Sequence, residues 1–307
     1  MISRAIIFIL ALTSLLRADT KSEIDRLFMQ ASSGEVRYRD LVQPARDSLI
    51  ALGDSAAKYL ALKLNSTDAR ERHTLVDIFG AIGPAATPYL LAALNTDNND
   101  QLRTTARCLG EVKDTTAIAD LLRVASHNDY TVRSQAVTAI GKIGGDDRLA
   151  ATMTRFASDS IELVRKSAVV ALRRIRSPSS VTALIAALDD DNFAVRLTAV
   201  DALLDLDTLA TPQIIDLLET TTHRRTQALA LRLIGELELF AAMKQVEKLT
   251  DAADPMVRGW AFWSWGRLRG PGIIHRLRSL EVIEDNLFVK SQLNETIDYL
   301  QRLSADE

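Results

Sequence analysis

The sequence predicts an all-α fold, an α–α superhelix of about nine helical hairpins that share one continuous core over residues 19–307. A pattern of about 31 residues returns along nearly the whole chain. Within each copy the apolar residues recur at helical spacing, and no segment shows the two-residue alternation of a half-buried strand. A repeat that buries its apolar face only against its neighbours explains both observations.

Each copy contains a helix that aligns on one recurring position, which we call the reference position. Arginine occupies it in the clearest copies, at Arg133, Arg165, Arg196 and Arg258. The equivalent residues of the other copies are Ala45, Arg72, Leu102, Gln227 and Lys290. Apolar or small residues recur at offsets −1, +3, +4, +6, +7 and +10, which form one face of a helix. In one copy these are Val132, Ala136, Val137, Ala139, Ile140 and Ile143.

A first, shorter helix precedes each of these second helices. In "SPSSVTALIAALDD" an i, i+3, i+4, i+7 stripe predicts it, formed by Val181, Leu184, Ile185 and Leu188. Ser177-Pro178, Thr87-Pro88 and Thr211-Pro212 predict helix starts, with the hydroxyl residue as N-cap and proline at the first helical position. Aspartates at offset −4 suit the N-cap of the second helix, at Asp68, Asp129 and Asp254.

The motif "VRSQAVTAIGKIGG", with its preceding aspartate and its spacing, resembles HEAT repeats, specifically the short type found in phycobilin lyases. This resemblance implies a helical solenoid and leaves the function open, because the repeat serves many unrelated roles. A glycine recurs in the second helix, for example at Gly110 and Gly235. Arg173 and Leu204 replace it in two copies, which we therefore expect to pack their helices differently.

The N-terminal segment predicts export. Arg4 precedes an apolar run from Ala5 to Leu16, which is too short to cross a bilayer core of about 30 Å. We interpret residues 1–18 as a signal peptide cleaved before Asp19, with a short membrane anchor as the alternative. The mature protein is then periplasmic or secreted and is not inserted in a membrane.

Charge and cysteine content narrow the partners. Cleavage removes Arg4 and Arg17 and no acid, so the net charge moves from −3 to −5, which disfavours nucleic acid as a partner. Cys108 is the only cysteine, so no disulfide can form within the chain. Cys108 takes a position held by alanine in other copies, which indicates a small buried thiol rather than a nucleophile.

The sequence contains no catalytic or metal-binding constellation, and we expect no cofactor and no enzymatic activity. HEAT-like repeats also build a di-iron hydroxylase with His-Glu metal ligands, whereas glutamate follows none of the histidines here, His73, His127, His223 and His275. The acidic run Asp189 to Asp191 lacks the ligand spacing of a calcium loop, and we expect an aspartate there to cap the second helix. The repeated arginines are better explained by capping and a charge ladder between repeats than by anion binding.

All three tryptophans lie in "VRGWAFWSWGRLRG". Phe262 and Trp265 fall on core offsets, whereas Trp260, Trp263 and Arg267 fall within about 60° of one another on the opposite side of the helix. We therefore expect these three residues to form an exposed patch on the concave surface that binds a protein or peptide, because indoles beside arginine often anchor interfaces. Two alternatives remain, that neighbouring repeats bury both indoles, or that a glycan stacks on them.

The function predicted from the sequence is an exported, non-catalytic scaffold that binds a protein partner. The alternative is a lyase or chaperone-like protein that holds a cofactor or chromophore in the groove of the same concave surface. This alternative rests on the resemblance alone.

Overall fold

The computed structural model describes residues 20–306, which fold into helices without a strand. The described part begins with a helix over residues 20–32. The α-helices that follow are α2 (Val42–Ala51), α3 (Asp54–Leu60), α4 (Ala69–Ile82), α5 (Thr87–Ala93), α6 (Asn99–Val112), α7 (Ile118–Val124), α8 (Tyr130–Ile143), α9 (Asp147–Met153), α10 (Glu162–Ile175), α11 (Pro178–Ala186), α12 (Phe193–Leu206), α13 (Thr211–Thr220), α14 (Arg224–Glu236), α15 (Met243–Leu249), α16 (Pro255–Arg269), α17 (Ile274–Ile283) and α18 (Leu287–Asp306). The 3-10 helices are η1 (Val36–Leu41), η2 (Ala61–Lys63), η3 (Gly83–Ala86), η4 (Thr115–Ala117), η5 (Thr154–Ser158), η6 (Ala187–Asp189), η7 (Asp207–Leu209), η8 (Phe240–Ala242) and η9 (Pro271–Ile273).

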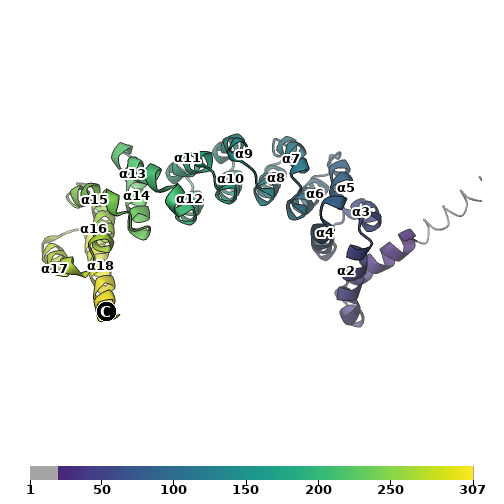
Figure 1. The fold of residues 1–307 in the computed structure, drawn as a ribbon, viewed down its shortest axis with the longest axis horizontal. Coiled ribbons are helices and arrows are strands. Elements are labelled where there is room, and N and C mark those ends of the chain that lie inside the picture. Colours follow the sequence, from purple (N-terminus) through teal and green to yellow (C-terminus); the bar gives the residue numbers. More distant parts are fainter. Residues whose placement is uncertain (1–19, 307) are drawn as a thin grey trace, which may run out of the picture. The chain divides into compact units, whose positions relative to one another are not determined.

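The helices pair into hairpins in the predicted register, so the prediction of an all-α repeat fold is confirmed. The even-numbered helices α2 to α18 are the second helices, and each contains one reference position. The described residues divide into two compact units, with the boundary between Gly145 and Asp146. Within each unit the second helices form one row and the first helices another (Figure 1). The proposed signal peptide, residues 1–18, lies outside the described residues.

The core of each unit consists of the predicted apolar positions. In α8, Val132, Ala136 and Ile140 are fully buried. In α11, Val181 and Leu184 are fully buried as well. Because each helix is short, most of the apolar surface that it buries must be covered by the adjacent repeats.

Glycines in the second helices allow the backbones of successive repeats to approach closely. A Cβ atom added at Gly110 would lie 3.0 Å from the Ala139 Cα atom of the next second helix. At Gly266 it would lie 2.1 Å from a methyl carbon of Thr296. Where Leu204 replaces this glycine, α12 contacts α14 less extensively than α14 contacts α16. Where Arg173 replaces it, α10 still contacts α12 extensively, so the different packing expected of both copies stays a prediction.

The helix caps agree with the prediction in part. Asp68, Asp129 and Asp254 are N-caps, and each accepts hydrogen bonds from two backbone amides of the following helix. Ser177 caps α11 as predicted.

The prediction that Thr87 and Thr211 act as N-caps is wrong. Both residues lie inside the first turn of their helices, because η3 leads directly into α5 and η7 leads into α13 through Ala210 alone. After Ala210, for example, the Ile214 amide donates to the Ala210 carbonyl oxygen, so the backbone itself continues the turn. No hydroxyl cap is then needed.

Residues Ala69–Ala93 are apolar and long enough to resemble a membrane span by length and composition. They form two helices of the repeat, α4 and α5, with Gly83 between them at a φ of 74°. Leu75, Ile78 and Phe79 of this stretch are fully buried within the unit. Core packing therefore accounts for its apolar composition.

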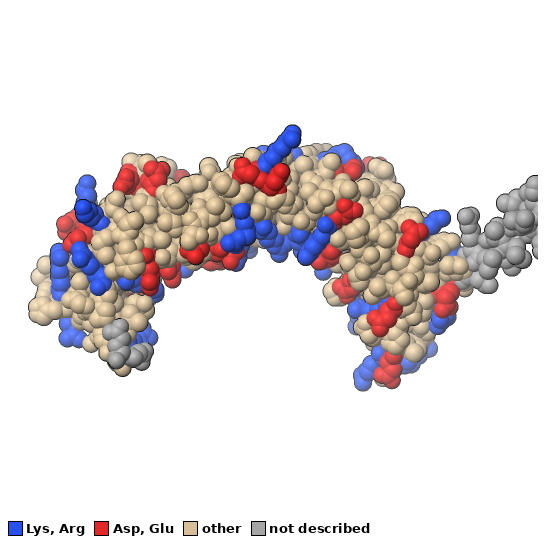
Figure 2. Space-filling model, viewed as in Figure 1, with Lys and Arg blue, Asp and Glu red and all other residues tan. Residues whose placement is uncertain are grey.

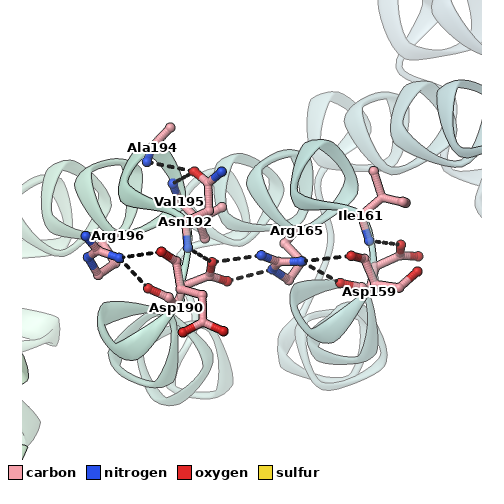
Figure 3. A network of polar contacts seen from close by, with 10 residues as sticks. Asp159, Ile161, Arg165, Asp190, Asn192, Ala194, Val195 and Arg196 are labelled. Atoms are coloured by element: carbon pink, nitrogen blue, oxygen red, sulfur yellow. Dashed lines mark hydrogen bonds and ion pairs between the residues drawn. The ribbon is translucent and has the colours of Figure 1, made fainter.

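The recurring arginines connect the loops of successive repeats (Figure 3). Arg165 donates two hydrogen bonds to the Asp190 carboxylate, at 2.7 and 2.9 Å, and also binds the carbonyl oxygens of Asp159 and Ser160 in its own repeat. Arg258 binds Glu284 in the same way, with both distances 2.9 Å. Asp190 and Glu284 occupy one equivalent position, six residues before a reference position. The predicted charge ladder between repeats is confirmed at these steps.

Replacing Glu284 with Gln should lower the free energy of unfolding at pH 7 by about 1.5–3 kcal/mol, the range for hydrogen bonds to charged groups. The Arg258 hydrogen bond lowers the pKa of the Glu284 carboxyl. The ionised Glu284 carboxylate therefore contributes to the free energy of unfolding above the ordinary glutamate pKa of about 4.3. This contribution is lost as the pH falls through the lower pKa of the folded state. Chemical denaturation at several pH values measures this, and Glu281→Gln is the control with the same charge change. A stability difference that persists unchanged at about pH 2 would contradict the assignment.

Candidate functional site

The three tryptophans lie on α16, which packs between α14 and α18. Phe262 and Trp265 are 4% and 1% exposed, as their core positions predict. The Arg276 guanidinium from α17 lies 4.6 Å from the centre of the Trp265 ring. This side of α16 is core.

The prediction that Trp263 is exposed is wrong, because its side chain is only 7% exposed. Gly235 of α14 leaves the space for the indole, since a Cβ atom there would lie 2.6 Å from the Trp263 Cζ3 atom. On the other side the Arg267 guanidinium covers the ring at 4.2 Å. Trp263 therefore packs between repeats, which is the alternative that the sequence left open for this residue.

Arg267 joins three consecutive second helices. Its guanidinium lies between the rings of Trp263 and Tyr299, 4.4 Å from the latter, and 4.0 Å from a carboxylate oxygen of Glu236. The side chain is 23% exposed, so part of its polar edge still reaches solvent. Cation–π contacts of this kind are worth about 0.5–2 kcal/mol each. Arg267 thus stabilises the packing and contributes a smaller surface than predicted.

Trp260 is the partly exposed indole of the cluster. It meets Trp263 edge to face, with ring centres 5.3 Å apart and planes 71° apart. The Arg232 guanidinium from α14 lies 6.0 Å from the Trp260 ring centre and 3.9 Å from Glu236. We call Arg232, Glu236, Trp260 and Arg267 the Trp260 patch. It combines an apolar ring, two cations and one carboxylate on adjacent second helices.

The sequence analysis missed Arg232, Glu236 and Tyr299. Glu236, Arg267 and Tyr299 share offset +9 on three successive second helices. Reading each offset across all repeats, rather than along one helix, would have placed these side chains together.

Cys108 and the histidines are the other candidate functional residues that the sequence offers. Cys108 is fully buried, and burial raises the pKa of its thiol, which opposes formation of a nucleophilic thiolate. Within residues 20–306 no group of three or more His, Cys, Asp or Glu side chains is arranged to hold a metal ion. His223 instead lies 2.8 Å from Asp189 on the surface.

The acidic run differs from the prediction in one detail. Asn192, not an aspartate, is the N-cap of α12, because its side chain accepts from the amides of Ala194 and Val195. Asp190 supports this turn by accepting from the Asn192 amide at 2.8 Å while it binds Arg165.

Over the face visible in Figure 2, acidic and basic side chains are interspersed.

Replacing Gly235 with Ala tests the packing of Trp263. Alanine normally stabilises a helix relative to glycine by about 1 kcal/mol. Here the added methyl group would meet Trp263 and also the Ser264 Cα atom at 3.1 Å, so we expect a net loss of about 1–3 kcal/mol. Gly272→Ala is the control, because its Cβ would enter open space. Thermal melting measures both variants, and a melting temperature for Gly235→Ala at or above that of the unchanged protein would contradict the packing.

Comparison with known proteins supports the fold. The family model for HEAT repeats matches residues 87–173, 123–204 and 154–227. No curated protein sequence matches the chain. The solved structures that it resembles include the Escherichia coli protein YibA, at 15% identity and a TM-score of 0.50, covering 88% of this chain and 98% of that one.

Two further structures match with lower TM-scores. Human deoxyhypusine hydroxylase matches at 19% identity and a TM-score of 0.37, covering 82% of this chain and 98% of that one. A structure of tubulin recruitment by microtubule polymerases with TOG-domain arrays matches at 10% identity and 0.40, covering 89% and 91%. These levels of identity carry no activity to this chain. The hairpin register agrees with the family model, and the chain contains HEAT repeats.

Proposed function

We propose that this protein is an exported, non-catalytic scaffold that binds a protein partner through the second helices of its repeats, with Trp260 as an anchor. The observation that carries the proposal is the Trp260 patch. Most other repeats place small or polar residues at the offset of Trp260, such as Thr74, Thr104 and Thr198, and the preceding repeat places Leu229 there. Trp260 and Leu229 therefore add apolar surface at two successive steps of the repeat, and Trp260 supplies the larger, aromatic side chain.

The geometry suits an interface anchor for two reasons. Trp263 and the Arg232 guanidinium flank the Trp260 ring, so binding requires little loss of side-chain freedom. Trp and Arg are also the residues most often found to dominate interface energies. The two cations and the carboxylate around the ring supply polar contacts at its edge. The net charge of −3 makes protein a more suitable partner than nucleic acid.

Replacing Trp260 with Thr should weaken partner binding by about 2 kcal/mol or more, because interface tryptophans typically cost this much when truncated. The free energy of unfolding should change far less than in Trp265→Ala, where loss of a buried indole costs about 3–5 kcal/mol. Affinity capture from the native secreted fraction, followed by binding measurements with the retained protein, compares the unchanged chain with Trp260→Thr. Chemical denaturation compares the two tryptophan variants.

The control for capture is Phe240→Ser, because Phe240 is 59% exposed and lies outside the Trp260 patch. A partner retained equally by Trp260→Thr and by the unchanged chain would exclude Trp260 as an anchor. If Trp260→Thr unfolds as readily as Trp265→Ala, Trp260 is a core residue and the site assignment fails.

Export has its own test. N-terminal sequencing of the secreted protein should begin near Asp19, because the apolar run before it is too short to span a membrane. Recovery of the full-length chain from the cytoplasm would contradict the localisation and would leave the scaffold role to be tested separately.

A further inference from the structure

A hollow of about 200 Å³ opens on the second helices α4, α6 and α8 of the unit that ends at Gly145. Three arginines line it against a single acid, Asp100. The buried Val76 and Thr104 and the side chain of Gln135 complete its lining. Arg72, Arg103 and Arg107 thus leave this hollow with an excess of two positive charges.

Arg72 lacks the carboxylate that the equivalent arginines bind. Arg165 and Arg258 each bind an acid in the next repeat, six residues before its reference position. The residue at that position after Arg72 is Thr96. Arg72 donates to the Ser66 carbonyl oxygen at 3.1 Å and meets no carboxylate at ion-pair distance within residues 20–306. Its guanidinium therefore keeps free donors.

Arg107 is exposed and also meets no carboxylate at ion-pair distance in the described part of the chain. The nearby Glu111 is already bound to Lys142 of α8, and this hydrogen bond lowers the pKa of the Glu111 carboxyl. Arg103 uses Asp100 as its ion-pair partner and donates to the Thr131 hydroxyl at 2.8 Å. Asp100 and Glu111 are thus already paired with other cations, whereas Arg72 and Arg107 have no carboxylate partner.

We propose that this hollow binds carboxylate side chains of an acidic peptide segment, which supply the acid that Thr96 does not. Guanidinium groups bind carboxylates with short, charge-assisted hydrogen bonds. Like charges that converge on one hollow repel one another, so an anionic ligand is favoured there.

The surroundings favour a peptide over a single small anion. A second hollow of about 580 Å³ shares Val76 and Arg107 with the first and continues past His73 and Lys113. Two hollows that share lining residues leave room for more than one side chain of an extended segment.

Asp77 and Glu111 also line the second hollow, where they pair with Arg46 and Lys142. The net negative charge of the chain disfavours a nucleic-acid backbone as the ligand. The site is separate in sequence from the Trp260 patch.

The first test measures binding of synthetic hexaglutamate to the full chain by isothermal titration calorimetry. Arg107→Gln should weaken binding about tenfold, as expected for the loss of a charge-assisted hydrogen bond. Arg123→Gln is the control, because it removes the same charge from the first helix α7 of the same unit, where Arg123 is 57% exposed. Trp260→Thr should bind hexaglutamate unchanged, so failure of this proposal and failure of the Trp260 anchor can be distinguished.

The second test restores the missing acid. The Thr96 hydroxyl accepts from the Asn98 amide at 3.2 Å, as Asp190 accepts from Asn192. Thr96→Asp should keep this turn and place a carboxylate toward Arg72. We expect a higher melting temperature and hexaglutamate binding about tenfold weaker, because the internal acid competes with the ligand.

Three probes complete the experiment, namely hexaglutamine, inorganic phosphate and a single-stranded hexanucleotide. Hexaglutamate should bind more tightly than each of them. Equal binding of hexaglutamine, or unchanged affinity in both Arg107→Gln and Thr96→Asp, would overturn the proposal. Tighter binding of phosphate or of the oligonucleotide would overturn the choice of an acidic peptide.

Discussion

The close packing of each second helix on the next is the constraint on which the rest of the structure depends. A single hairpin of two short helices has too little apolar surface to stay folded, so every repeat relies on its neighbours for its core. Gly110 and Gly235 let the backbones approach at these contacts, and Gly266 leaves room for a methyl group of Thr296. The arginine ladder then sets the spacing of the loops at one end of the hairpins, through bonds such as that from Arg165 to Asp190. The packing between second helices and the arginine ladder together determine where the side chains on the second helices lie.

Most of the fold could be predicted from the sequence because a repeat supplies the same information many times. A single apolar pattern of this length is ambiguous, whereas its return in successive copies fixes both the helix type and the register. The capping aspartates and the ladder followed from comparing copies. The caps at Thr87 and Thr211 could not be predicted in this way, because their 3-10 turns depend on the path of the chain between helices.

The candidate site was less predictable, for a physical reason. An angle around one helix separates core from surface only if a single neighbour covers the helix. In a solenoid, the helices before and after also cover its flanks. Trp263 lies on such a flank, where Gly235 leaves room for its indole and Arg267 covers it. Trp260 lies one helical turn earlier, beside Arg232, and keeps part of its surface exposed. The difference depends on residues in the adjacent repeats.

Departures from the repeat are the places where we propose functional sites, because the shared pattern already accounts for stability. Each departure must be considered separately, because in some of them the changed side chain finds other partners within the chain. Arg196 also lacks a ladder acid, with Thr221 at the equivalent position, but its guanidinium binds two loop carbonyl oxygens and lies 5.7 Å from the Phe193 ring centre. At Arg72 the same substitution by threonine coincides with two further arginines around a hollow. Where several unpaired arginines surround one hollow, the absence of a ladder acid indicates a site for an anionic ligand. Where the arginine stands alone, the same absence indicates only a weaker contact between repeats.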